Sequence, residues 1–185
     1  SLVDENGNFY RSHVYRSGKK KFFYEDVKKE AIAQMNQFKS LMGFYPEHIE
    51  GHAVESEVIN QVFIDIAREF NIHCSLLSNS RAAECNSDSN YLEIITPEFS
   101  IYSQIINNGV TIENFISDDF GILKIPENKV MELHFHPGYI DEFVLKNSSL
   151  TLPRCRDLAT LCDPRLKEWF LKNEIELISF KDIKL

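Results

Sequence analysis

The chain has 185 residues, 43% of them hydrophobic and 26% charged, which is ordinary for a folded soluble protein and long enough for one sizeable core. Its formal net charge of -8 repels polyanions, so we expect no nucleic-acid partner despite the short basic run at 18–21. No apolar run approaches the roughly 20 residues that cross a bilayer, and the first ten residues do not resemble a signal peptide. We therefore expect a cytoplasmic protein without a membrane partner.

Helix and strand patterns alternate along the chain. Apolar spacing and helix-start residues predict helices at 25–42 (ended by Gly43), 56–70, 111–120, 153–162 and from 164 onward. Short or alternating apolar runs predict strands at 21–24, 48–52, 72–77, 99–103, 130–136 and 176–180. A small, polar stretch at 78–90 is predicted to be a long loop. This order favours an α/β fold of mostly parallel strands with crossover helices, formed by residues 1–185 as a single domain.

The segment MELHFHPGYID, residues 131–141, puts titratable and apolar side chains in alternation. In an extended strand Glu132, His134 and His136 point to one face, and the residues between them point to the other. The Pro-Gly that follows turns the chain and would hold His136 at the mouth of a cavity. An edge strand with solvated histidines explains the pattern equally well.

The segment HIEGH repeats this pattern, since alternation places His48, Glu50 and His52 on one face. Imidazole nitrogens bind zinc and other divalent ions, and a nearby carboxylate can orient the ring or accept a proton. Solvated or structurally bonded histidines are the alternative. His13 and His73 have no such neighbours in the sequence, so we expect them to be structural or on the surface.

The cysteines are too far apart in the sequence for a C-x-x-C metal site, and we expect free thiols. They are Cys74, Cys85, Cys155 and Cys162.

Four motifs, in this order and with fitting spacings, carry a family resemblance over nearly the whole chain. They are G-x-x-P-x-H-I-E-G-H at 43–52, M-E-L-H-F-H-P-G-Y-I-D at 131–141, P-R-C-R-D-L at 153–158 and D-P-R-L-K-E-W-F-L-K-N-E-I-E-L-I-S-F-K-D-I at 163–183. The chain thereby resembles the YdjC-like carbohydrate deacetylases, the chitooligosaccharide deacetylase family. Glu30 and Gln34 also match a Glu and a Gln on the family's helix before the first histidine motif.

The resemblance implies a metal-dependent amidohydrolase that removes N-acetyl groups from N-acetylglucosamine-containing oligosaccharides, on an incomplete or distorted TIM-barrel-like (β/α) fold. It implies a divalent metal ion, magnesium or zinc, with His52 in the place of one of three ligands. His136 matches the family's H-P-G motif and would act as general acid or hydrogen-bond donor in the transition state. Glu132 would be its partner, while Arg154 and Asp157 match an R-x-x-E pair. We expect these last three residues to bind substrate.

Other residues depart from the family pattern. Residues 1–9 resemble the segment after the family's third strand, so we expect the preceding A-D-D-F-G and G-x-H motifs, with two metal ligands, to be missing. The chain would then correspond to about the C-terminal two-thirds of a deacetylase domain. Glu50 replaces an Asp, which it would imitate by orienting His52 or moving a proton, and residues 53–56 replace further histidines. The near-copy SDDFG at 117–121 comes after His52, so an acidic helix end or turn is favoured there.

Two alternatives to an active enzyme stay open, namely a non-catalytic descendant that binds sugar or is structural, and an unrelated α/β scaffold with structural histidines. A small carbohydrate is the expected partner. Strands missing from a barrel would expose sheet edges, so we also expect a homo-oligomer. The enzymatic interpretation requires His52 and His136 to face one shared pocket.

Overall fold

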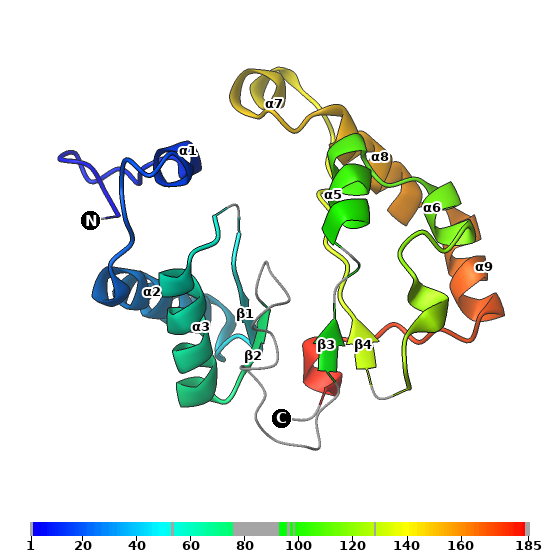
Figure 1. Ribbon diagram of the computed structural model, residues 1–185, viewed down its shortest axis with the longest axis horizontal. Coiled ribbons are helices and arrows are strands. Elements are labelled where there is room, and N and C mark those ends of the chain that lie inside the picture. Colours follow the sequence, from blue (N-terminus) through cyan, green and yellow to red (C-terminus); the bar gives the residue numbers. More distant parts are fainter. Residues whose placement is uncertain are drawn as a thin grey trace. The chain divides into compact units, whose positions relative to one another are not determined.

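The computed structural model describes residues 2–52, 54–75, 93–95, 97, 99–127 and 129–183. The chain divides into two compact units, one formed by Ser1–Glu93 with Ser179–Leu185 and the other by Ile94–Ile178 (Figure 1). The single domain expected over 1–185 stays a prediction. The predicted loop at 78–90 and Cys85 lie outside the described residues.

The first unit is built around a parallel β-α-β element (Figure 1). Its elements are α1 (Ser12–Arg16), α2 (Tyr24–Met42), β1 (His48–Glu50), α3 (Glu57–Phe70) and β2 (His73–Ser75). The two strands pair in parallel, with His48 opposite His73 and Glu50 opposite Ser75. A parallel pair needs a crossover, and α3 supplies it. The helices expected at 25–42 and 56–70 are confirmed, and so is the strand expected at 48–52, although it ends at Glu50.

The core of the first unit lies where α2 and α3 pack together and α3 packs on the strands. The buried residues of α2 recur at four-residue spacing, as its sequence predicts: Val27, Ala31 and Met35. Gly43 ends α2 with a left-handed φ of 84°, a conformation that glycine adopts without steric cost. At the start of α3 the Ser56 hydroxyl accepts a hydrogen bond from the amide of Ile59 at 3.1 Å.

The C-terminal residues return to the first unit. They form a short 3-10 turn, η3 (Phe180–Asp182), in place of the strand expected at 176–180, which is wrong. The physical reason lies in Ser179 and Asp182, whose side chains and backbone amides cap each other and commit the chain to a turn. Ile183 is buried, and its carbonyl accepts a 3.0 Å hydrogen bond from Nε2 of His73. His73 is therefore structural, as expected, and His13 is exposed.

The second unit is mainly helical and carries a second two-stranded sheet (Figure 1). Its elements are β3 (Glu93–Ile95), α5 (Phe99–Asn108), α6 (Ile112–Ile116), the 3-10 turn η2 (Ile122–Lys124), β4 (Lys129–Met131), α7 (Glu142–Asn147), α8 (Leu152–Leu161) and α9 (Pro164–Lys172). Strands β3 and β4 pair. The helices expected from 111, 153 and 164 are confirmed, although α6 ends before 120.

An aromatic core organises the second unit around Phe115, which is 1% exposed. Phe120 lies 5.1 Å from it and Trp169 5.8 Å from it, measured between ring centroids, both edge-on. Met131, Leu133 and Phe135 pack against this core, as the alternation in 131–136 predicts. The turn at SDDFG, with Phe120 buried, is also as expected.

Three further strand predictions need correction. Residues 99–103 open the helix α5, because a short run of apolar and β-branched residues cannot by itself separate strand from helix. At 21–24 there is no strand, and α2 begins at Tyr24. The strand expected at 130–136 ends at Met131. The Glu132 amide still donates to the Ile95 carbonyl at 2.8 Å, but the His136 amide bonds to a side chain instead of a neighbouring strand.

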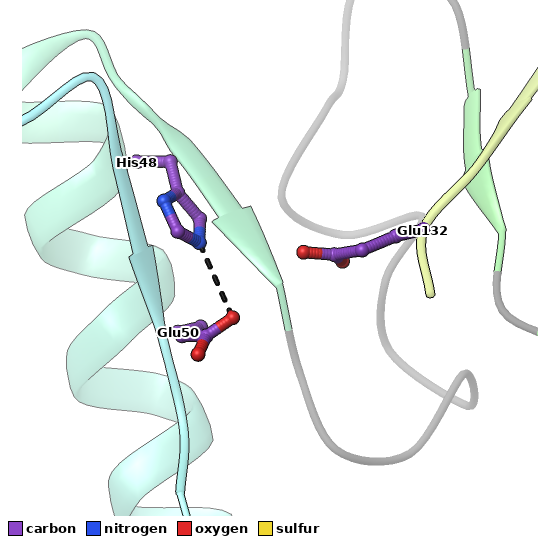
Figure 2. A group of neighbouring side chains, drawn as sticks. All are labelled: His48, Glu50 and Glu132. Carbon is purple, nitrogen blue, oxygen red and sulfur yellow. Dashed lines mark hydrogen bonds and ion pairs between the residues drawn. The ribbon is translucent and has the colours of Figure 1, made fainter. Parts of the chain in front are cut away.

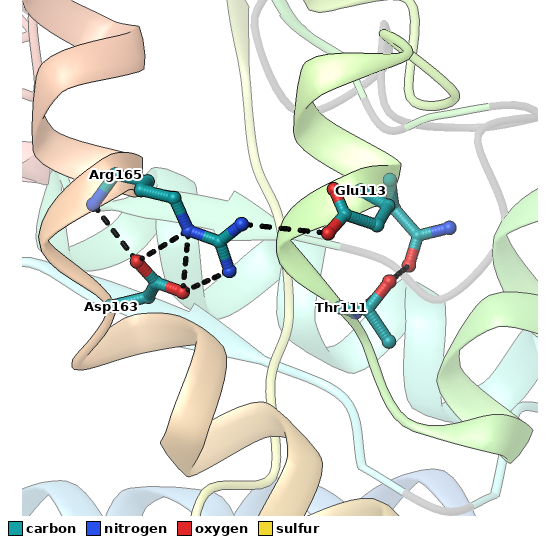
Figure 3. A network of polar contacts seen from close by, with 5 residues as sticks. Thr111, Glu113, Asp163 and Arg165 are labelled. Atoms are coloured by element: carbon teal, nitrogen blue, oxygen red, sulfur yellow. Dashed lines mark hydrogen bonds and ion pairs between the residues drawn. The ribbon is translucent and has the colours of Figure 1, made fainter.

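An ionic cap fixes the start of α9, as Figure 3 shows. The Asp163 side chain accepts from the amide of Arg165 at 2.9 Å and from its guanidinium at 2.7 Å, and the same guanidinium lies 3.6 Å from Glu113 of α6. The Arg165 side chain, and then its amide, hold the pKa of Asp163 below its ordinary value. The cap expected at Asp163 is thus confirmed.

The α/β class is confirmed, with a small parallel sheet and many helices. Cys74, Cys155 and Cys162 are free thiols, as expected. Over the described part of the chain, no helix is both long enough and apolar enough to cross a membrane.

Candidate functional site

Strand β1 brings an imidazole and a carboxylate together in the first unit. Nε2 of His48 lies 3.4 Å from a carboxylate oxygen of Glu50, because residues two apart in a strand share a face (Figure 2). The side chains are 27% and 40% exposed, so water and solutes reach them. Phe180 stacks flat on the imidazole of His48, with the two ring centroids 3.9 Å apart. The predicted shared face of His48 and Glu50 is therefore present.

A cavity of about 590 Å³ opens beside β1 within the first unit. Its polar lining includes side chains from β1, from the residues just after it and from α2: His48, Glu50, His52, Glu30 and Gln34. Its aromatic lining consists of Phe9, Tyr10, Tyr15, Phe22, Phe38 and Phe63. A hollow of this size with convergent polar groups and apolar walls is typical of small-molecule sites.

His52 stands just past the end of β1 and is exposed. It lines the same cavity as Glu50 and His48. Glu30 and Gln34 bond to each other on α2 at 2.9 Å, as expected for residues four apart on a helix. The structure therefore gathers in one cavity the residues that two separate stretches of sequence suggested.

The remaining candidate residues belong to the second unit. Nε2 of His134 lies 3.2 Å from Oε1 of Glu132, whose side chain is only 13% exposed. Glu132 is labelled in Figure 2, and it follows β4 directly. The two side chains thus lie close together within the same segment of chain, as expected from their shared face.

His136 is fixed through its backbone. Its amide donates a 2.8 Å hydrogen bond to Oδ2 of Asp157, which is 1% exposed. Arg154 lies on the same helix, α8, where its carbonyl accepts from the Gly138 amide at 3.2 Å and its Nε donates to the Leu150 carbonyl at 3.0 Å. The H-P-G turn is thus attached to α8 at two backbone points.

Sequence reasoning placed Asp157 at the substrate and missed its bond to the backbone of His136. The structure has Asp157 buried beneath the H-P-G segment, with its second oxygen bonded to the Val110 amide at 2.8 Å. No local pattern marks a contact between residues 21 or 47 positions apart. Helical spacing gave no signal either, because Asp157 shares its face of α8 with the polar residues Arg154 and Thr160. The aromatic lining of the cavity was also missed.

Comparisons with known proteins agree with the motifs. The family model described as YdjC-like protein matches residues 1–172. A carbohydrate deacetylase of Clostridium beijerinckii is 27% identical over 190 residues, covering 99% of this chain and 70% of that protein. A carbohydrate deacetylase of Oceanobacillus iheyensis is 32% identical over 171 residues, covering 91% of this chain and 67% of that protein.

A solved structure supports the fold. The crystal structure of a proposed cellobiose-phosphate cleavage protein from Enterococcus faecalis V583 superimposes with a TM-score of 0.70 at 24% identity, covering 98% of this chain and 68% of that one. The α/β fold and the order of the histidine and carboxylate motifs indicate the class of protein. The match of the family model over residues 1–172 identifies the family. The chain belongs to the YdjC-like family.

Proposed function

We propose that this chain works as a carbohydrate deacetylase, a hydrolase that removes N-acetyl groups from N-acetylglucosamine-containing oligosaccharides with the help of a divalent metal ion. The observation that carries the proposal is the cavity beside β1, where His48, Glu50 and His52 meet an aromatic wall. The names of the relatives support the reaction class. The substrate and the metal belong to the proposal alone.

The residues at β1 fit a divalent ion by their chemistry. An imidazole nitrogen and a carboxylate oxygen 3.4 Å apart offer two ligands from His48 and Glu50, and exposed His52 offers a third donor nearby in sequence. Nitrogen and oxygen donors suit zinc, while magnesium depends more on oxygen and water. When bound, such an ion polarises an amide carbonyl and makes water more acidic. Glu50 would orient His52 or carry a proton beside it.

The walls of the cavity suit a sugar that carries both polar and apolar faces. Aromatic rings such as Tyr10 and Tyr15 offer flat apolar surface, and the Glu30–Gln34 pair offers hydrogen-bonding groups to hydroxyls. A volume of about 590 Å³ falls within the range of ordinary ligand sites. An N-acetylated sugar unit is the ligand that we propose for this cavity.

We assign the acid role to His136. Its imidazole can change charge near neutral pH, so it can donate a proton to a leaving amine or a hydrogen bond to a developing oxyanion. The support is a backbone held by Asp157, which limits where the ring can go. Arg154 and Glu132, both on or beside the H-P-G segment, would contact substrate hydroxyls.

Two structural proposals accompany the function. The parallel β1–α3–β2 element would be one repeat of a distorted TIM-barrel-like fold. Several large apolar side chains at the end of α2 are exposed, and they support the expected homo-oligomer: Phe38, Leu41, Met42 and Phe44.

Acetate release and sugar binding together separate the enzyme from its alternative. We expect purified protein with added magnesium or zinc to release acetate from di-N-acetylchitobiose, and His52→Ala to abolish the release. Glu50 in place of the family's Asp favours the second candidate, a sugar-binding descendant without activity. For that candidate the sugar would bind by calorimetry while no acetate appeared with either ion.

A further inference from the structure

Asp157 connects two segments of the second unit that are far apart in sequence. Its Oδ1 accepts the Val110 amide and its Oδ2 accepts the His136 amide, each at 2.8 Å, while the residue is 1% exposed. A buried carboxylate is tolerated when its oxygens are bonded, and such charge-assisted hydrogen bonds are short and strong. Each oxygen of the Asp157 carboxylate therefore accepts a hydrogen bond from one backbone amide.

Two other residues of α8, Thr160 and Arg154, also bond to these two segments. The buried Thr160 hydroxyl donates to the Val110 carbonyl at 2.7 Å, so Val110 is held at both its amide and its carbonyl. The Arg154 carbonyl accepts the Gly138 amide at 3.2 Å. Asp157 thus bonds the backbone of His136 itself, whereas the Thr160 hydroxyl bonds the backbone of Val110.

We propose that Asp157 is a positioning residue, which acts through His136 and does not contact substrate. By fixing the amide from which the His136 side chain departs, Asp157 sets the place of the imidazole in the reaction. A misplacement of about 1 Å at a catalytic group costs roughly 100-fold in rate. The catalytic part of this inference rests on the proposed function, and the structural part stands without it.

The test uses two near-isosteric variants. Asp157→Asn keeps the shape but leaves an amide NH₂ facing one of two backbone N–H donors, so one bond is lost. Thr160→Val removes the neighbouring bond to Val110 and spares His136. Amide exchange followed by NMR should show the His136 amide exchanging about tenfold faster or more in D157N, the loss expected for one hydrogen bond. In T160V it should stay within about twofold of wild type.

Enzyme kinetics distinguish a positioning role from a merely structural one. We expect D157N to lower kcat for acetate release by about 100-fold with little change in KM, and to cause no further loss when His136→Ala is already present. An equal loss in the H136A background would overturn the positioning role. T160V should keep kcat within about threefold of wild type.

The outcomes distinguish failure of this inference from failure of the proposed function. If wild type releases no acetate, the proposed function fails while the exchange data still decide whether Asp157 holds His136. If D157N does not fold, amide exchange in the wild-type protein decides. A His136 amide that exchanges as fast as one in an unstructured peptide would overturn the inference, and a protected His136 amide would support it.

Discussion

The ring of Phe180 lies flat on the ring of His48, with centroids 3.9 Å apart and planes at 5°. The same C-terminal turn bonds His73 through the carbonyl of Ile183, so both strands of the first sheet meet this segment. One face of a candidate metal-binding imidazole is therefore covered by a residue 132 positions later in the chain.

Phe180→Ala should destabilise the first unit and loosen His48. Stacked aromatic pairs contribute about 0.5–1.5 kcal/mol beyond their buried area, so we expect a loss of about 1–2 kcal/mol in the free energy of unfolding. Urea denaturation measures it. Phe143→Ala, which removes an exposed ring from α7, is the matched control and should change stability by about 0.5 kcal/mol or less. Equal effects of the two variants would contradict the stacking contribution.

Glu50→Gln should weaken binding of a divalent ion. Replacing the carboxylate removes a ligand or an orienting partner of the histidines, a change that typically costs about 10–100-fold in metal affinity. Calorimetric titration with zinc and magnesium measures the affinity, with His13→Ala as the control because His13 is exposed on α1. Unchanged affinity in E50Q would remove Glu50 from the metal site.

The cap of α9 should give the protein an acid-sensitive contribution to stability. The Arg165 side chain lowers the pKa of Asp163 in the folded state below its unfolded value, so the unfolded state binds the proton more tightly. The contribution is present above the unfolded pKa of about 4 and is lost as pH falls through the folded pKa. Asp163→Asn should therefore lower the melting temperature at pH 7 and make progressively less difference below pH 4.

Thermal melts between pH 2.5 and 7 check this pH dependence. The control is Glu127→Gln, an exposed change in the same unit, which should melt within about 1 °C of wild type at each pH. A gap between D163N and wild type that widened with acid would have the wrong sign for the cap.

Gly109→Ala should be among the most damaging single changes in the second unit. Gly109 has a φ of +81°, and an added Cβ would lie 2.7 Å from Cα of Pro153 and 2.8 Å from Cβ of Arg156. Strain and overpacking together predict a loss of about 2–4 kcal/mol. Gly7→Ala shares the left-handed φ of +82° but meets nothing within 4 Å, and should cost about 1 kcal/mol. Denaturant unfolding of both variants separates the cost of the close contact from the cost of the left-handed φ.

The elements that the sequence predicted well carry their signals locally. The apolar spacing through α2 and the glycine after it mark both the helix and its end, and Asp163 with Pro164 marks the start of α9. The shared face of His48 and Glu50 follows from strand alternation alone.

The predictions that failed have both local and distant causes. Residues 99–103 have strand-like composition but form helix, and the segment after Met131 leaves the sheet because the His136 amide bonds to Asp157. The cavity arises from the fold of the first unit as a whole, so its aromatic lining carries no local pattern. Tertiary contacts of this kind override local preference.

Self-association is a prediction of its own. The exposed apolar side chains at the end of α2 favour contact between copies, with Leu41 at 73% exposure and Met42 at 55%. Light scattering behind size-exclusion chromatography should give a mass of at least two chains, and Leu41→Lys should reduce it. A single-chain mass across micromolar concentrations would oppose the prediction.

Acetate release from di-N-acetylchitobiose, measured with and without added magnesium or zinc, tests the proposed activity most directly. We predict release that requires the ion and falls by about 100-fold or more in both H52A and H136A, because each removes a group proposed to act at the reacting amide. Release that is independent of divalent ions, or that persists at the wild-type rate in either variant, would contradict the assignment.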